Sequence, residues 1–534
     1  MCCFNVLQPS IMHKPYDNPP WQAWRLAALI VLVNIVFSLP ALCGLEYLRH
    51  TEADRTLIGW EMSRRADYLI PHLLGDRYIT KPPLFYWLLA AAFSIVGAPL
   101  EWAARLVSLL GASIFLGLHY LLLRKSAVPL STALVSSIIL GTNFAFFTSS
   151  TTAEIDMTFV VLCGLSIHLS FLSITADRGL LWALSSWAFA GLAFLTKGPP
   201  VLIFLGAPLV LFMILQMCRQ TQATAGLFLV RNTARQLPGM LLFLCMIGTW
   251  IYLLQQHVPM ADLKLYFDQE ILQRFHSDPK AGMRSRGLFF YPLFLIGALM
   301  PWSLLALGYF RRTVPGRENA RFLLYCLCAV IPAVLIFSLS SGKSGRYILP
   351  VTPFLSYLLA AGAGRIWSPD SRMFIRTVSV LTALLLLGRL GYAWIYAPLR
   401  NEKLSVKPAA AALNAAVPAS EPVYILEMFE RWLPYYLIRS GREVLRLTPS
   451  RVAETAANPA PGARLYILLN AESESWRTVE MKNLDPSARE LARYQVHRKI
   501  FALWEIGPQY AVRLNLRRLF PDEISSPDRK DPGP

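Results

Sequence analysis

Residues 154–217 read EIDMTFVVLCGLSIHLSFLSITADRGLLWALSSWAFAGLAFLTKGPPVLIFLGAPLVLFMILQM, and they contain three apolar stretches, near 154–174, 180–196 and 199–217. Each stretch has close to the roughly 20 residues that an α-helix needs to cross the hydrocarbon core of a membrane. The charged side chains of the segment lie at the ends of these stretches. The segment therefore predicts three successive membrane-spanning helices.

The same pattern extends over most of the first 400 residues. Of the 534 residues, 55% are hydrophobic and 16% are charged, which is too apolar for an ordinary soluble domain. A shorter apolar run at 84–97 either crosses the membrane or lies along its surface. We expect about 11 spans, and at most 13, near residues 25–45, 103–123, 130–149, 154–174, 180–196, 199–217, 237–256, 287–310, 322–340, 347–365 and 374–396.

Basic residues cluster in alternate short loops, which marks these loops as cytoplasmic. If the run at 84–97 does not fully cross, all the clusters share one side, the tail at 1–24 is cytoplasmic, and the chain after residue 398 lies outside. Orientation and contact with phospholipid then account for the net charge of +18, and nucleic acid is not an expected partner. The clusters are Arg124–Lys125, Arg178, Arg219–Arg235, Arg311–Arg321 and Arg365–Arg376.

Composition divides the chain into four parts, the first of which is the tail at 1–24. Residues 25–398 form the transmembrane domain, with an outer loop at 46–102, and residues 399–524 form a small soluble α/β domain. The charged, proline-rich end at 525–534 is expected to be disordered. In the soluble domain the sequence predicts strands at 423–426, 465–469 and 501–506 and helices at 434–440 and 487–494.

Cysteine and histidine give little direct chemistry. The eight cysteines lie in spans, at span ends or in the N-terminal tail, so no external disulfide framework is expected. His72, His257 and His276 are metal candidates on the outer side, but no pair has ligand spacing. We predict no metal site, and dependence on a divalent metal stays open. His119 and His168, inside spans, are expected to hydrogen-bond to a neighbouring helix.

Ionisable groups gather on the predicted outer face. The first outer loop carries Glu52 and Asp54, and the second outer turn carries Glu154 and Asp156. Two acidic turns brought together can supply a base for an acceptor hydroxyl and a second carboxylate to orient it. Basic groups on the same face can neutralise a phosphate leaving group. These are Lys81, Lys197, Lys343 and Arg346.

Several motifs between about residues 45 and 360 follow the order found in one enzyme family. They read EM at 61–62, DYLIPHLLG at 67–75, YITKPPLFYW at 78–87, EWAARL at 101–106, LTKGP at 195–199 and SGKSGRYILP at 341–350. In these motifs the chain resembles the bacterial lipid A aminoarabinose transferases, a branch of the protein mannosyltransferase-like GT-C glycosyltransferases. The resemblance implies an all-α, polytopic GT-C bundle of about 11–13 transmembrane helices in the bacterial inner membrane, with the small α/β domain periplasmic.

The resemblance also implies substrates and roles. The donor is a polyprenyl-phosphate-linked sugar, and the acceptor is a glycolipid such as lipid A or another envelope component. Asp156 matches the family's second acidic residue, Lys81 a lysine that contacts the donor phosphate, and Tyr78 a tyrosine of the same cavity. Ser341–Tyr347 matches a loop that reaches the lipid phosphate, and Arg346 stands where relatives often carry His or another polar residue.

One position departs from the family pattern. Counted back from Glu61, the family's Asp-Glu pair falls at Thr51-Glu52, so the leading aspartate is absent. We predict that Glu52 takes its place, with Asp54 as the second choice. A phosphate acceptor would need little base assistance, whereas a sugar hydroxyl would need more.

Two other functions remain compatible with the pattern. One is a polymerase or ligase of undecaprenyl-linked glycans on the same scaffold, which would share the basic residues. The other is a secondary transporter, although the ionisable groups cluster at span ends and no half-repeat is evident.

Overall fold

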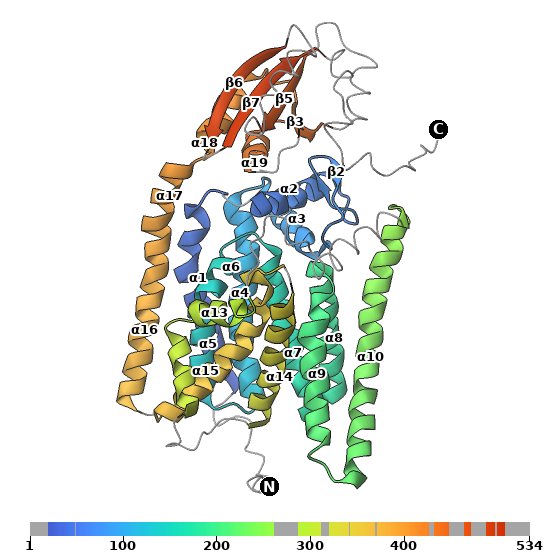
Figure 1. The fold of residues 1–534 in the computed structure, drawn as a ribbon, viewed down its shortest axis with the longest axis vertical. Helices are drawn as coiled ribbons and strands as arrows, with labels where there is room; N and C mark the ends of the chain where they lie inside the picture. Colours follow the sequence, from blue (N-terminus) through green and yellow to red (C-terminus); the bar gives the residue numbers. More distant parts are fainter. Residues whose placement is uncertain are drawn as a thin grey trace.

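The computed structural model describes residues 20–47, 50–260, 287–310, 320–340, 342–368, 371–426, 432–447, 464–470, 488–496 and 499–507. Long helices form a bundle, and a small β-sheet lies beyond one end of it, which we call the sheet end (Figure 1). The predicted tails before residue 20 and at 525–534, as well as His276 and Ser341, lie outside the described residues.

Eight helices in the described ranges are long and apolar enough to cross a membrane, which confirms a multi-pass membrane protein. The last of these spans begins with α16 and continues through a π-helical turn (Tyr392–Tyr396) into α17 (Ala397–Leu404). The spans are formed by α1 (Pro20–Gly44), α4 (Glu101–Lys125), α7 (Ile155–Thr175), α8 (Gly179–Lys197), α9 (Pro200–Met217), α10 (Gln222–Gln255), α14 (Ala320–Leu339) and α16 (Arg372–Gly391).

Two segments predicted as single spans are bent pairs. One is α5 (Leu130–Thr142) with α6 (Phe144–Ser150), bent by 61°, and the other is α13 (Phe290–Ala298) with the 3-10 helix η2 (Trp302–Phe310), bent by 111°. Counted as one span each, they bring the total in the described chain to 10. The one remaining expected span, near 347–365, is α15 (Thr352–Ile366), which has only 15 residues and follows the 3-10 turns η3 (Gly345–Tyr347) and η4 (Leu349–Val351).

The α5–α6 bend has a local cause. Asn143 is extended, so it ends α5, and its side chain caps α6 by accepting a hydrogen bond of 2.9 Å from the Phe146 N–H. The buried Arg389 of α16 donates to the carbonyl of Gly141 and, at 3.0 Å each, to Asn34 and Ser38 of α1. The break inside the bundle therefore leaves this carbonyl paired, as a membrane interior requires.

The short apolar run forms α3 (Leu84–Val96), which lies with α2 (His50–Arg65) at the sheet end (Figure 1). Thirteen residues give a helix of about 20 Å, shorter than the roughly 30 Å hydrocarbon core. Buried side chains of both helices, including Ile58 and Phe93, share one apolar cluster. Gly59 lies at the contact, where an added Cβ would come 2.5 Å from the Cβ of Leu89.

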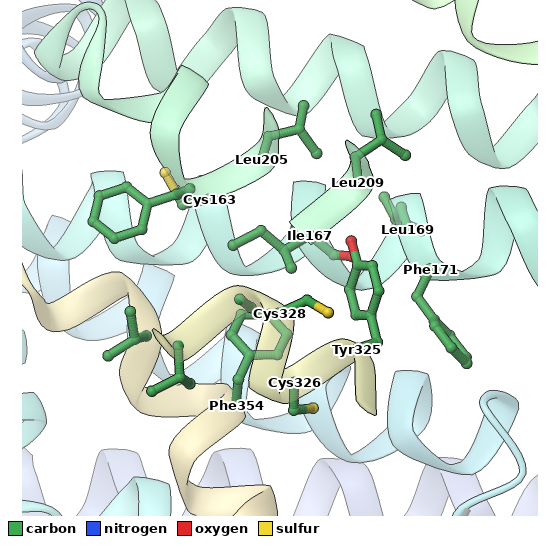
Figure 2. Close-up of a cluster of buried hydrophobic side chains, with 14 of the residues drawn as sticks. Cys163, Ile167, Leu169, Phe171, Leu205, Leu209, Tyr325, Cys326, Cys328 and Phe354 are labelled. Atoms are coloured by element: carbon green, nitrogen blue, oxygen red, sulfur yellow. The ribbon is translucent and has the colours of Figure 1, made fainter. Parts of the chain in front are cut away.

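Helix α7 runs through the centre of the bundle and is buried over most of its length. Figure 2 shows Ile167 of α7 between Leu205 of α9, Tyr325 of α14 and Phe354 of α15, with Phe171 of α7 on the other side of Tyr325. Close packing of this kind associates helices where the surrounding lipid is equally apolar.

The two intramembrane histidines bond to each other across helices. His119 Nδ1 of α4 lies 2.9 Å from His168 Nε2 of α7, and His119 Nε2 lies 3.0 Å from the Ser136 hydroxyl of α5. This confirms the expected hydrogen bonding between neighbouring helices.

The C-terminal sheet has five strands in the order β4-β3-β5-β7-β6. Strand β3 pairs in parallel with β4 and β5, and β7 pairs antiparallel with β5 and β6. The strands predicted at 423–426, 465–469 and 501–506 and the helix at 434–440 are confirmed. The bounds are α18 (Lys407–Ala416), β3 (Val423–Leu426), α19 (Trp432–Arg439), β4 (Val444–Arg446), β5 (Leu465–Asn470), β6 (Arg489–Val496) and β7 (Lys499–Ile506).

The helix predicted at 487–494 was wrong, because this segment forms β6. Its residues, RELARYQV, include several good helix formers. Pairing with β7, in which Glu490 faces Trp504 and Tyr494 faces Phe501, outweighs this weak local preference.

The sheet region contacts the outer loop directly. Tyr47 and Leu57 share a buried cluster with Tyr435 of α19. The Tyr435 hydroxyl donates to the Pro99 carbonyl at 2.6 Å, and Arg439 forms an ion pair with Glu101 at the start of α4. A two-stranded hairpin, β1 (His72–Leu73) and β2 (Asp76–Arg77), completes this contact through the hydrogen bond from the Arg446 N–H to the Leu74 carbonyl, 3.2 Å.

Candidate functional site

Helix α2 presents different residues on two sides. Thr51 and Arg55 are one turn apart and so lie on one face, where Thr51 donates to Glu154 and Arg55 donates to the Tyr78 hydroxyl at 2.9 Å. Glu52, on another face, bonds to Arg105 of α4. Because α2 is helical, the adjacent side chains of Thr51 and Glu52 point in different directions, toward Glu154 and Arg105.

Glu52 lies in a buried ion pair. Its Oε1 accepts from Arg105 Nε at 2.7 Å and from the Ala153 N–H at 2.9 Å, and its Oε2 accepts from Arg105 Nη2 at 3.3 Å. Arg105 also donates to the carbonyls of Leu42, at 2.9 Å, and Leu45. The side chains of Arg105 and Glu52 are only 2% and 4% exposed. The pair thus joins α2, α4 and the end of α1.

A second group of charges, which we call the charge cluster, surrounds the N-terminus of α7. It consists of Glu154, Asp156, Lys197 at the end of α8 and Arg346 in η3. Lys197 donates to Asp156 Oδ1, and Arg346 Nη1 lies 3.4 Å from Asp156 Oδ2 and 3.2 Å from Glu154 Oε1. Negative side chains suit this position because helix N-termini carry partial positive charge.

Burial within the charge cluster is uneven. The two carboxylates are 3% and 5% exposed and Lys197 is 7% exposed, whereas Arg346 is 40% exposed. Burial and the neighbouring charge of Asp156 raise the pKa of Glu154, although Arg346, Arg55 and the Thr51 hydrogen bond oppose this. Lys197 and Arg346 balance the two carboxylates of the charge cluster when both are ionised, and the nearby Arg55 acts on Glu154 as a further cation.

Tyr78 and Asp54 lie near Arg55, and Lys81 and Lys343 lie in the segments before α3 and η3. Besides Tyr78, Arg55 donates to the Tyr86 hydroxyl of α3, and the half-buried Asp54 acts electrostatically on Tyr86. Lys81 is half-buried in the turn before α3, and Lys343 is buried before η3.

The structure thus brings together Asp156, Lys197 and Arg346 and places Tyr78 on Arg55, but it directs Glu52 to Arg105. Sequence reasoning missed Arg55 and, among the site residues, Glu154. If residues 51–55 are assumed to be helical, the spacing of four residues places Thr51 and Arg55 on the same face, and this would have pointed to Arg55.

Within the described ranges, no group of three or more His, Cys, Asp or Glu side chains is placed to hold a metal ion. His72 lies 3.8 Å from Asp67, and burial and the charge of Arg65 lower its pKa, while His257 is exposed. The question of a divalent metal therefore stays open.

The chain is similar to known proteins in both sequence and fold. Residues 80–252 match the family model described as dolichyl-phosphate-mannose-protein mannosyltransferase. The chain is 28% identical over 346 residues to the undecaprenyl phosphate-alpha-4-amino-4-deoxy-L-arabinose arabinosyl transferase of Pectobacterium atrosepticum, which covers 63% of this chain and 58% of the relative. An enzyme of the same name from Pseudomonas aeruginosa (strain UCBPP-PA14) is 28% identical over 395 residues, with coverages of 72% and 67%.

The fold is also that of a solved structure. The crystal structure of ArnT from Cupriavidus metallidurans bound to undecaprenyl phosphate matches with a TM-score of 0.70 and 19% identity, over 90% of this chain and 98% of that chain. The chain thus has the GT-C fold of membrane glycosyltransferases. Within that class it resembles the bacterial lipid A aminoarabinose transferases, as the outer-loop motifs predict. It spans less than two thirds of the length of the first of these relatives.

Proposed function

We propose that this protein is a membrane glycosyltransferase that moves a sugar from a polyprenyl-phosphate donor to lipid A or another cell-envelope acceptor. The observation that carries the proposal is the charge cluster: two buried carboxylates, the buried Lys197 and the partly exposed Arg346 meet at one helix N-terminus in a fold shared with such enzymes. Names of relatives that include undecaprenyl phosphate support the donor class.

The donor phosphate is assigned to the basic groups of the site. Arg346 is the most accessible member of the charge cluster. Tyr78 bonds to Arg55, and Lys81 and Lys343 lie in the segments before α3 and η3. Lys197, which bonds to Asp156, contributes mainly by fixing that carboxylate. Cations held in place before reaction stabilise the charge that develops as the phosphate leaves, without reorganisation cost.

Asp156 is assigned to orient the acceptor, because Lys197 and Arg346 hold both of its oxygens in fixed positions. Groups positioned in this way convert binding energy into a near-attack geometry. The sugar then passes in a single displacement from the phosphate oxygen to the acceptor oxygen.

We also propose the sidedness that the sequence predicts. Residues 25–398 form the transmembrane domain of an inner-membrane protein, residues 399–524 form a periplasmic α/β domain, and the site faces the periplasm. The contacts of Tyr435 and Arg439 with residues 99 and 101 support a common compartment for the outer loop and the sheet.

The test is transfer by the purified protein in detergent from an undecaprenyl-phosphate-linked aminoarabinose to lipid A. Mass spectrometry of envelope glycolipids, from cells with and without the protein, would identify the sugar and the acceptor in vivo. A sugar added to lipid A is the expected result. Appearance of the sugar on an undecaprenyl-linked glycan would instead indicate a polymerase or ligase.

Lys81→Ala tests the assignment of the donor phosphate. We expect a fall in turnover of about 10²- to 10³-fold, typical for loss of one charge-stabilising group, with the thermal midpoint unchanged. Lys403→Ala, at an exposed position of α17, is the matched control and should leave both unchanged. Wild-type turnover in Lys81→Ala would exclude this role for Lys81, whereas an inactive wild-type protein would overturn the proposed donor and acceptor.

A further inference from the structure

Three buried carboxylates, Glu52 on α2 and Glu154 and Asp156 at the start of α7, differ in how their oxygens are occupied. Both oxygens of Glu52 accept from Arg105, and Oε1 also accepts from Ala153. Both oxygens of Asp156 face cations, Oδ1 toward Lys197 and Oδ2 toward Arg346. A carboxylate whose oxygens are all engaged by cations is a poor proton acceptor, because protonation would break these contacts.

Glu154 is arranged differently. Its Oε1 accepts from Thr51 and pairs with Arg346 at 3.2 Å. Among the residues that the structure describes, none donates a hydrogen bond to its Oε2. One oxygen thus fixes the side chain, and the other is available to a substrate.

Thr51 explains how Glu154, which immediately precedes α7, can serve in place of a carboxylate on α2. Its hydroxyl stands where the family resemblance places an aspartate, and it donates to Glu154 Oε1. An aspartate at 51 would set a second negative charge against Glu154, whereas the threonine supplies a donor. Glu154, two residues before Asp156, therefore brings a carboxylate from the start of α7 to the hydroxyl of Thr51.

We infer that Glu154 is the catalytic residue that accepts the proton of the acceptor, and that Glu52 is a positioning residue that locks α2 against α4. The inference rests on the proposed glycosyl transfer and names a residue for it. The acceptor hydroxyl oxygen bonds to the anomeric carbon, and the bond from that carbon to the donor phosphate oxygen breaks. The electron pair leaves with the polyprenyl phosphate, and the hydroxyl proton passes to Glu154 Oε2.

The electrostatics of Glu154 suit such a base. Burial and the charge of Asp156 raise its pKa above the usual glutamate range, so its carboxylate binds a proton more strongly than a surface glutamate would. The charged groups that face it are Asp156, Arg346 and Arg55. Because the base must be ionised, activity should fall as the pH drops through this raised pKa.

The test compares Glu154→Gln with Glu52→Gln in the full-length protein. Both changes preserve volume and remove one charge. For Glu154→Gln we expect a loss of at least 100-fold in kcat, an unchanged thermal midpoint, and loss of the acid limb of the pH profile in the residual activity. Binding of undecaprenyl phosphate should stay the same or tighten, because a negative charge beside Arg346 has been removed.

For Glu52→Gln we expect a lower thermal midpoint, a smaller loss of turnover, and an acid limb at the wild-type pH. Near-wild-type kcat in Glu154→Gln would overturn the inference while leaving the proposed function in place. So would the disappearance of the acid limb in Glu52→Gln alone. If Glu154→Gln fails to fold, Glu154→Asp provides the second variant, with a reduced rate and a displaced acid limb expected. Failure of the wild-type protein to transfer from a polyprenyl-phosphate sugar would overturn both proposals.

Discussion

The buried pair Glu52–Arg105 allows a prediction whose size follows from the structure. Both side chains are nearly inaccessible, and Glu52 accepts two hydrogen bonds from Arg105. Removing one member of such a pair leaves an uncompensated buried charge and costs about 3–5 kcal/mol. Glu52→Gln and Arg105→Met should each fall in this range.

The corresponding change in thermal midpoint follows from the length of the chain. At about 2.1 cal/mol/K per residue, 534 residues give an unfolding entropy of about 1.1 kcal/mol/K if the chain unfolds as one unit. A loss of about 4 kcal/mol then lowers the midpoint by about 4 °C. Unfolding of the detergent-solubilised protein can be followed with a thiol-reactive fluorophore, since Cys163 and Cys326 are buried.

The double variant decides whether the pairing is responsible. Glu52→Gln with Arg105→Met leaves no buried charge, so its destabilisation should be clearly less than the sum of the two single losses. Arg493→Met is the control, because the exposed pair of Arg493 with Glu490 should contribute about 1 kcal/mol or less. Strictly additive losses, or single variants as stable as this control, would refute the reasoning.

Two further predictions concern packing and charge. Gly59→Ala should destabilise the protein by about 1–3 kcal/mol, because the new Cβ would meet Leu89 at 2.5 Å; Gly111→Ala, with open space at its Cβ, is the thermal-unfolding control and should show no loss. Arg346→Gln removes a cation that lowers the pKa of Glu154, so the acid limb of the transfer rate should move to higher pH; a limb that stays in place or moves to lower pH would contradict the assigned base.

The sequence predicted well those features that depend on hydrophobicity alone. Span positions follow from the number of apolar residues, and the three buried strands of the C-terminal sheet follow from short apolar runs. The bend at Asn143 was not predicted, because hydropathy is the same for a straight and a bent apolar segment. Strand β6 was missed since its partner, β7, decides its conformation.

The sequence predicted most of the charged residues of the candidate site, but not which of them contact one another. The sequence predicts a loop at 46–102, and a loop gives no helical phase from which to place side chains. The helical phase of α2 determines that Thr51 faces Glu154 while Glu52 faces Arg105. Partners such as Lys197 and Arg346 lie 41 and 190 residues from Asp156, and only the packed bundle brings such distant residues together.

The position of α2 links the stability of the fold to the chemistry of the site. The helix is fixed to α4 by Glu52 and Arg105, to α3 at Gly59, and to the sheet region by the cluster that contains Leu57. None of these contacts involves Glu154, yet all of them determine where the Thr51 hydroxyl lies. Because hydrogen bonds weaken steeply with distance and angle, a small rotation of α2 would break the hydrogen bond from Thr51 to Glu154 Oε1 and leave that oxygen held by Arg346 alone. Destabilising changes on the buried face of α2 should therefore reduce activity before they unfold the bundle.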